Sequence, residues 1–221
     1  MSTLSAIVLT YNKSWIFREF AASLDRQSRR PDEIIVVDDA STDGMRRELA
    51  ELPPSWTILA LGKNGGQSRA RNLGCRHAAG DYVIFLDADI VMSPDMLASL
   101  SGALDADPTA GVAYGHFERQ GSRNDPVRSI PWNAEVLQHR NYISMVSLVR
   151  RSHLPEPPLD ETLHRYEDWD LWIRMSLAGR SGVLVDRTLF TAHYRPEDLS
   201  GRGESLDWYR KVLAKHKFPL R

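Results

Sequence analysis

The sequence has little cysteine, no long apolar segment and no excess of charge of either sign. Cys75 is the single cysteine among 221 residues, which excludes an internal disulfide framework and is compatible with a reducing cytoplasm. The 28 basic and 29 acidic residues leave a net charge of −1, so nothing global indicates nucleic-acid binding. No apolar run approaches the roughly 20 residues that span a bilayer, and the N-terminal segment lacks the basic leader of a signal peptide. We therefore expect a cytoplasmic chain, at most peripheral to a membrane.

Two glycine-rich phosphate-binding motifs are also missing. The sequence contains neither Gly-x-Gly-x-x-Gly nor Gly-x-x-x-x-Gly-Lys-Ser/Thr, which argues against nucleotide-dependent dehydrogenases and P-loop enzymes. Hydrophobic residues make up 42% and charged residues 26%, which is ordinary for a globular protein with a sizeable core.

Strand and helix patterns alternate along the first half of the chain. Short apolar runs typical of buried strands occur at Leu4–Thr10, Glu33–Asp39, Thr57–Leu61 and Tyr82–Leu86, with helical spacing between them. This alternation predicts an α/β fold, with a mostly parallel central sheet flanked by helices. Residues 118–141 are expected to form a long loop, which is usually functional or mobile. Further predictions are strands at 142–149 and 183–185, a loop from 191, and an amphipathic helix from Glu204.

Two acids end the fourth predicted strand. The apolar run after Gly80 stops at Asp87 and Asp89. Carboxylates at the carboxyl end of such a strand lie where open α/β sheets bind ligands, and an extended backbone sends both side chains to one side. Such hard oxygen ligands suit a Mg²⁺ or Mn²⁺ ion that also holds substrate phosphates. The alternative is that Asp87 caps the next helix and Asp89 lies in a polar loop.

Five segments in order resemble the family 2 glycosyltransferases with the GT-A fold. They are Val8–Asn12 (VLTYN), Val36–Asp43 (VVDDASTD), Asn64–Gly74 (NGGQSRARNLG), Phe85–Asp89 (FLDAD) and Glu167–Trp172 (EDWDLW). The resemblance implies a single GT-A (Rossmann-like) domain over residues 1–221. Residues 1–110 would form the nucleotide-sugar half, 111–203 the acceptor and catalytic half, and 204–221 a C-terminal amphipathic helix.

The resemblance also implies a donor site. Thr10 and Tyr11 would flank the base and Asp39 would accept a hydrogen bond from it, while Arg71 would lie near ribose and phosphate. A planar fork of donors suits phosphate oxygens. Asp38 is expected to cap the following turn instead. The complete set of expected donor-binding residues is Thr10, Tyr11, Asn12, Asp39, Arg71, Asp87, Ala88 and Arg195.

For the metal and the catalytic base the resemblance implies four residues. Asp89 would ligate a divalent cation (Mg²⁺ or Mn²⁺), and His193 would complete the metal site; a lone histidine at a strand end is otherwise structural. Asp168, beside Glu167 at the start of a tryptophan-rich helix, would be the general base that takes the proton of the acceptor hydroxyl. The alternative for Asp168 is a plain capping role. Asp170 is expected to be a surface charge.

One segment departs from the family pattern. A proline-rich turn, Pro155–Pro158, stands where the family commonly has a glycine-rich one, which puts the shape of the acceptor pocket in question. A basic C-terminal segment from Glu204 could rest on an anionic bilayer, although a solvated helix face is the simpler interpretation.

The sequence therefore predicts a metal-dependent, inverting sugar transferase. It would move a sugar from a nucleoside-diphosphate sugar to a hydroxyl of a saccharide or lipid-linked acceptor. Two alternatives stay open: a catalytically inactive nucleotide-sugar binding module, and a nucleotidyltransferase. The latter would need a glycine-rich triphosphate loop with a lysine, which Leu4–Asn12 lacks.

Overall fold

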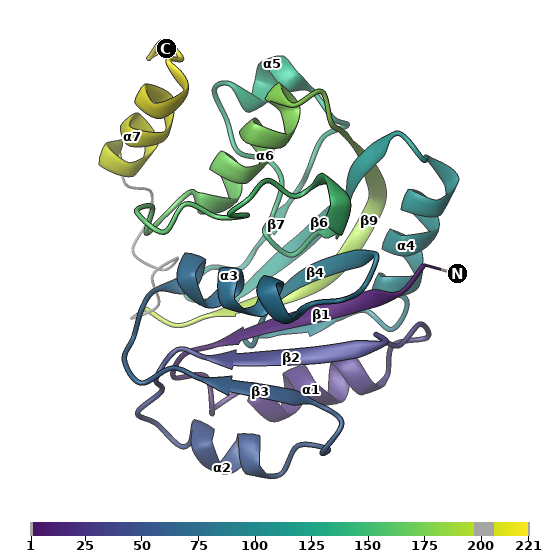
Figure 1. Cartoon of the computed structure of the whole chain (residues 1–221), viewed down its shortest axis with the longest axis vertical. Coiled ribbons are helices and arrows are strands. Elements are labelled where there is room, and N and C mark those ends of the chain that lie inside the picture. Colours follow the sequence, from purple (N-terminus) through teal and green to yellow (C-terminus); the bar gives the residue numbers. More distant parts are fainter. Residues whose placement is uncertain (1, 197–205, 221) are drawn as a thin grey trace.

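The computed structural model describes residues 2–196 and 206–220. Its strands are β1 (Leu4–Thr10), β2 (Glu33–Asp38), β3 (Thr57–Ala60), β4 (Tyr82–Asp87), β5 (Ile90–Met92), β6 (Ala110–Gly121), β7 (Asp125–Val127), β8 (Leu148–Arg150) and β9 (Ser181–Tyr194). Its α-helices are α1 (Phe17–Asp25), α2 (Met45–Ala50), α3 (Gln67–His77), α4 (Met96–Ala106), α5 (Ala134–Leu137), α6 (Glu167–Leu177) and α7 (Leu206–His216). The described strands form one curled sheet in the order β3-β2-β1-β4-β8-β6-β9-β5, with β7 beside β6 (Figure 1).

The N-terminal half is the predicted parallel sheet. β1 lies between β2 and β4, with Ile7 opposite both Ile35 and Phe85, and β3 extends the sheet beyond β2. The inner strands are buried on both faces, which is why they appear in the sequence as continuous apolar runs. All of these strands end at the same edge, so the residues that follow them are brought together. The prediction of an α/β fold flanked by helices is confirmed.

The second half of the sheet differs from the predicted parallel arrangement. β8 pairs antiparallel with β4 and β6, and β5 pairs antiparallel with β9, while β6 and β9 are parallel. The expected loop at 118–141 is wrong in its first part, because β6 continues to Gly121 and returns through β7 as a hairpin. This end of β6 alternates between partly buried and exposed residues, so no continuous apolar run marks it.

Strand β9 is also longer than predicted. It runs unbroken through 14 residues to Tyr194, whereas the sequence indicated only 183–185 and a loop from 191. Conversely, the strand expected at 142–149 is reduced to Leu148–Arg150. The predicted loop at 191–203 and the predicted helix start at Glu204 fall partly outside the described residues.

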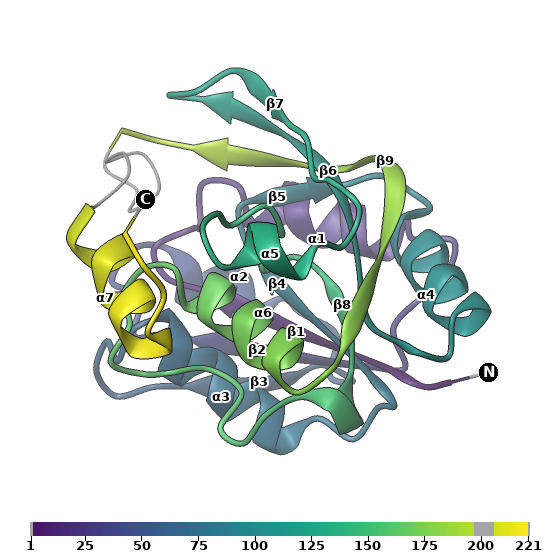
Figure 2. The same cartoon turned by 90° about the horizontal axis from the view of Figure 1, so that it is seen from above.

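Two layers of helices cover the sheet, and β1 divides its side chains between them. Leu4, Ala6 and Val8 pack with α1, α2 and α4, while Ile7 faces the opposite cluster, which includes α3, α6 and α7. Figure 2 shows α1 on one side of the sheet and α3 with α7 on the other. Helix α7 thus packs against the rest of the fold through Val212 and Leu213. No helix within residues 2–196 and 206–220 is long and apolar enough to cross a bilayer.

Candidate active site

A cavity of about 570 Å³ opens where β1, β2 and β4 end. Ligand sites of open α/β sheets lie at this edge. The cavity is acidic at its floor, and its wall on β6 and β9 is aromatic. The polar part of its lining includes Tyr11, Lys13, Asp39, Asp87, Asp89 and Arg195. The aromatic part includes Phe117, Phe190 and Tyr194.

Asp39 lies at the end of β2 and fixes the glycine turn in front of α3. Its carboxylate accepts the backbone N–H groups of Gly65 at 2.7 Å and Gly66 at 2.9 Å. Burial raises the pKa of Asp39, although these two N–H groups oppose the shift. Gly66 adopts a positive φ of 87°, which a glycine tolerates without strain. Asp39 therefore combines a structural role with a place on the cavity surface.

Arg71 connects the acidic pair at the end of β4 to helix α6. Its guanidinium is almost fully buried and donates to Asp87 at 2.5 Å and to Glu167 at 2.9 Å. Burial would lower the pKa of Arg71, but the carboxylates of Asp87, Glu167 and Asp168 outweigh it and raise the pKa. Arg71 is not among the residues that line the cavity, and its predicted place near ribose and phosphate stays a prediction. Its two ion pairs hold the start of α6 against the end of β4.

Asp168 follows Glu167 in the first turn of α6 and is partly buried. It accepts the amide N–H of Asn141 at 2.9 Å and its neighbour's backbone N–H, that of Trp169, at 2.7 Å. Burial, followed by the charge of Glu167, raises the pKa of Asp168 to about 7. A carboxylate that gains and loses its proton near neutral pH has the property that a general base requires. Asp168 is not among the residues that line the cavity, but the contacts of Glu167 and Arg71 connect this turn of α6 to Asp87.

Asp89 is the better placed of the two acids for a cation. It lines the cavity, and its Oδ2 is 2.7 Å from the ammonium of Lys13. Asp87 also lines the cavity but already accepts from Arg71. Hard carboxylate oxygens in the lining of such a cavity fit Mg²⁺ or Mn²⁺, with the remaining ligands left to substrate phosphates and water.

His193 is not among the residues that line the cavity. It lies opposite Asp89 where β9 pairs with β5, and its backbone N–H donates to the carbonyl oxygen of Asp89 at 2.9 Å. Burial lowers the pKa of His193, and the charge of Glu19 on α1 opposes that shift. Among the described residues, no cluster of three or more histidine, cysteine, aspartate or glutamate side chains could hold a metal ion. Asp89 and Asp87 could hold a cation at this edge, and the participation of His193 stays a prediction.

Of the other residues expected to bind the nucleotide sugar, some line the cavity and others stabilise the surrounding turns. Tyr11, Ala88 and Arg195 line the cavity. Thr10 is buried and donates to the sulfur of Met45, on the face of β1 away from the cavity. Asn12 lines the cavity but also supports the turn after β2, where its carbonyl oxygen accepts the N–H of Thr42 at 2.8 Å. Thr10 is thus not brought to the donor side.

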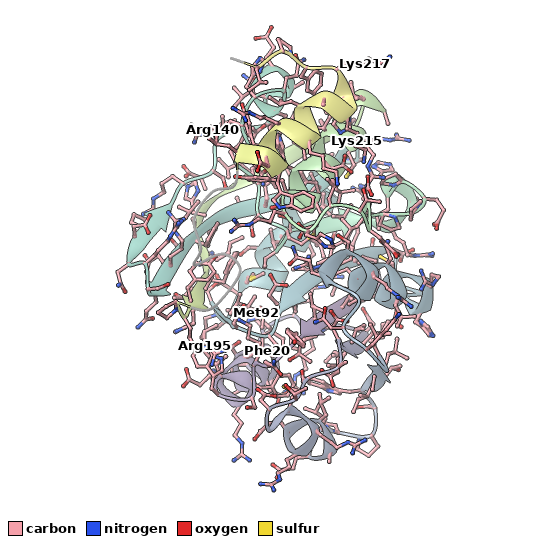
Figure 3. All side chains as sticks on the ribbon, turned by 90° about the vertical axis from the view of Figure 1, so that its left-hand side faces the viewer. Phe20, Met92, Arg140, Arg195, Lys215 and Lys217 are labelled. Atoms are coloured by element: carbon pink, nitrogen blue, oxygen red, sulfur yellow. The ribbon has the colours of Figure 1, made fainter. Side chains whose placement is uncertain are left out.

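Arg195 stands at the end of β9, beside the start of α1. Its guanidinium lies 4.9 Å from the centre of the Trp15 ring and donates to the carbonyl oxygen of Asn12 at 3.3 Å. Figure 3 shows Arg195 on the α1 side of the molecule, whereas Lys215 and Lys217 mark α7 at the opposite end. Asp38, as predicted, accepts from the Ser41 backbone and hydroxyl and so stabilises the following turn.

Two supporting residues were not anticipated. Asn72 on α3 holds the proline-rich segment: its side chain accepts the N–H of Leu159 and donates to the carbonyl of the same residue, both at 2.9 Å. Asp170 was expected to be a surface charge, which is wrong. It is fully buried beneath α7, where Lys215 and His216 contact one carboxylate oxygen at 2.6 and 2.8 Å. Asn72 lies within the Asn64–Gly74 segment, which was the one indication in the sequence that it matters. Nothing in the sequence pattern indicated the burial of Asp170.

Comparison with known proteins places this geometry in a family. The sequence model described as "Glycosyl transferase family 2" matches residues 5–158, more than two thirds of the chain. The O-antigen biosynthesis protein RfbC of Myxococcus xanthus is 30% identical over 96% of this chain and 18% of its own length. The amylovoran biosynthesis glycosyltransferase AmsB of Erwinia amylovora is 27% identical over 86% of this chain and 69% of its own length. This chain thus spans less than a fifth of the Myxococcus relative and about two thirds of the Erwinia one.

Solved structures show the same fold. TarS residues 1–349 from S. aureus, in complex with UDP-GlcNAc, superpose with a TM-score of 0.78 at 22% identity, covering 95% of this chain and 64% of that one. The mannosyltransferase PcManGT from Pyrobaculum calidifontis, in complex with GDP-Man and Mn²⁺, gives a TM-score of 0.67 at 19% identity, covering 97% and 69%. Together with the family match, these results show that the chain belongs to the family 2 glycosyltransferases and has the GT-A fold.

Proposed function

We propose that this domain transfers a sugar, with inversion, from a nucleoside-diphosphate sugar to a hydroxyl acceptor. The observation that carries the proposal is the Asp87–Arg71–Glu167 ion-pair chain. It ties the acids of the donor cavity to helix α6, whose first turn carries Asp168. This connection would fix the position of the base relative to the leaving diphosphate. Such an arrangement suits direct displacement, in which the acceptor attacks from the face opposite the diphosphate.

Asp168 is the proposed base. With a pKa of about 7 it is largely ionised just above neutral pH, and it would take the proton as the acceptor oxygen attacks. Asn141 and the Trp169 N–H hold the carboxylate in place. Glu167 is bound to Arg71, so we assign it to positioning the helix rather than to proton transfer.

On the donor side, Asp39 and Tyr11 would hold the nucleoside, and Asp87 the ribose. A divalent cation held by Asp89 would supply charge stabilisation for the leaving diphosphate. The aromatic wall of Phe117, Phe190 and Tyr194 would carry the transferred sugar or the acceptor, because apolar ring faces pack against sugar C–H groups. The names of the relatives, O-antigen and amylovoran biosynthesis, favour a saccharide or a lipid-linked saccharide as acceptor.

Release of nucleoside diphosphate from a sugar donor tests the proposal without a known acceptor. Thermal-shift screening of UDP, GDP, ADP, CDP and dTDP with Mn²⁺ identifies the base, because a ligand of the native state raises apparent stability. The matching nucleotide sugars are then incubated with the wild type, Asp168→Asn and Asp89→Ala. We expect slow, metal-dependent release that drops by about 10²-fold or more in each variant, with unchanged circular dichroism.

The two alternatives give different results in the same assay. An inactive binding module would show the thermal shift but no release in any variant. A nucleotidyltransferase would release pyrophosphate from a nucleoside triphosphate and a sugar phosphate, and would not hydrolyse the nucleotide sugar.

A further inference from the structure

Lys13 is a cation of the cavity that neither the family motifs nor the proposed mechanism uses. It follows β1, and its carbonyl oxygen accepts the N–H groups of Ile16 and Phe17, so its backbone is fixed at the entrance to α1. The side chain reaches across the cavity floor to Asp89, with an Nζ–Oδ2 distance of 2.7 Å. The side chains of Lys13 and Asp89 are 16% and 13% exposed, so the pair is mostly shielded from water.

The position of this ammonium conflicts with that of a metal ion. The oxygen that Lys13 contacts belongs to the carboxylate best placed to hold a divalent cation. An ammonium and a divalent cation repel each other, and they compete for the same lone pairs. One of the two has to withdraw when the other binds. Lys13 can withdraw, because a lysine carries its charge on a flexible four-carbon stem.

A withdrawn Lys13 stays close to where the donor diphosphate would lie. Its backbone stays anchored beside Asn12 and Tyr11, which line the same cavity. Phosphate oxygens of the donor would then be partners of suitable charge, to which an ammonium donates strong hydrogen bonds. Arg195 stands on the same side of the cavity and adds to the positive potential there.

We propose that Lys13 is an exchange residue: it occupies Asp89 before the cation arrives, yields Asp89 to the cation, and then binds the diphosphate of the donor. The proposal rests on the assignment of Asp89 as the metal ligand under the proposed function. It follows that binding of the cation and binding of the donor diphosphate are thermodynamically linked. Binding of the cation frees a phosphate-binding group, and binding of the phosphate keeps that group off Asp89, so each ligand strengthens the other.

Replacement of Lys13 therefore has two effects of opposite sign. In Lys13→Met, Mn²⁺ alone should bind about tenfold more tightly, because a partly buried charge-assisted pair no longer competes. In the same variant, pyrophosphate binding in the presence of Mn²⁺ should weaken by roughly three- to tenfold, because one phosphate contact is lost. A general loss of fold or of cavity shape would weaken both ligands and cannot produce this pair of results.

The experiment uses the full chain and titrates Mn²⁺ by electron paramagnetic resonance, then pyrophosphate by calorimetry at fixed Mn²⁺. The matched control is Lys63→Met, which makes the same change at an exposed lysine outside the cavity and should alter neither affinity. Lys13→Arg keeps the charge and should keep the Mn²⁺ affinity within about threefold of wild type. If Lys13→Met folds poorly, Lys13→Gln supplies the neutral side chain instead. Lys13→Arg then remains the variant that keeps the charge.

Asp89→Asn separates failure of this proposal from failure of the proposed function. If Asp89→Asn abolishes Mn²⁺ binding while Lys13→Met leaves it unchanged or weaker, the metal site stands and the exchange role of Lys13 is overturned. If Asp89→Asn binds Mn²⁺ as the wild type does, the assignment of Asp89 as metal ligand is itself overturned. Tighter Mn²⁺ and weaker pyrophosphate in Lys13→Met, with both lost in Asp89→Asn, support the whole scheme.

Discussion

The amide of Asn141 is expected to keep the pKa of Asp168 from rising further above neutrality. Burial and the charge of Glu167 raise this pKa to about 7, and the Asn141 hydrogen bond is one of the contacts that oppose the rise. Because Asn141 donates to the ionised carboxylate at 2.9 Å, it stabilises the charged form. We therefore expect Asn141→Ala to raise the pKa of Asp168.

The size of the shift follows from the contact that is lost. A hydrogen bond to a charged group contributes about 1.5–3 kcal/mol, and water can replace part of it because Asp168 is only partly buried. If about 1 kcal/mol is lost, at about 1.4 kcal/mol for each pKa unit, the pKa rises by roughly 0.5–1 unit. The Trp169 N–H contact stays in place and limits the shift.

Two measurements test this prediction. Carboxyl-carbon NMR titration of protein labelled at aspartate reports the pKa directly, with Asp168→Asn identifying the resonance. The rate of donor hydrolysis against pH gives the same quantity through activity. A base acts only when ionised, so the rate falls as the pH drops through its pKa, and in Asn141→Ala this fall should occur at higher pH. At pH values above the pKa of Asp168 in both proteins, the hydrolysis rates of the wild type and Asn141→Ala should converge.

The matched control is Asn133→Ala, which removes a side chain of the same kind that caps the neighbouring helix α5 without contacting Asp168. It should leave both titrations unchanged. A wild-type pKa near the ordinary value of 3.8, or a shift to lower pH in Asn141→Ala, would refute the electrostatic reasoning.

Three further predictions concern charge and stability. Asp168→Asn should raise the thermal midpoint more at pH 8 than at pH 5, because above about pH 7 the native state of the wild type has to hold an unfavourable charge. Arg71→Ala should lower the free energy of unfolding in urea by about 3–5 kcal/mol, because it leaves Glu167 buried without its cation. Asp170→Asn should destabilise by about 2–4 kcal/mol at neutral pH. Burial opposes ionisation of Asp170, but hydrogen bonds from His216 and Lys215 lower its pKa, so this difference should narrow as the pH falls below about 4.

The N-terminal half of the fold could be predicted because its inner strands, β1, β2 and β4, are buried on both faces. Such strands appear as apolar runs, and the residues that end them, Asp39 and Asp87, must then meet at one edge of the sheet. The hairpin of β6 and β7 could not be found in this way, because one face of each strand is open to solvent and the apolar signal is interrupted.

The surroundings of individual residues were harder to predict than the strands. The position of His193 opposite Asp89 depends on the register of β9 with β5, which the local sequence pattern does not show. Asp170 lies on a face of α6 that would be exposed if the chain stopped earlier. Helix α7 covers that face, and the charges of Lys215 and His216 make burial of the carboxylate favourable. A contact between segments so far apart leaves no trace in the local pattern.

The charge balance of the site supports the proposed cation independently of any motif. Near the cavity and the start of α6 the structure gathers more carboxylates than cations: Asp39, Asp87, Asp89, Glu167 and Asp168 against Lys13, Arg71 and Arg195. Burial raises the pKa of Asp39, Glu167 and Asp168, and in each case the charge of a neighbouring carboxylate adds to the shift. A diphosphate would add to that charge. Binding it without another positive charge would require the acids to take up protons, and a protonated Asp168 could not act as a base. A divalent cation held by Asp89 would remove the conflict, and under the proposed exchange it would make Lys13 available to the phosphates at the same time.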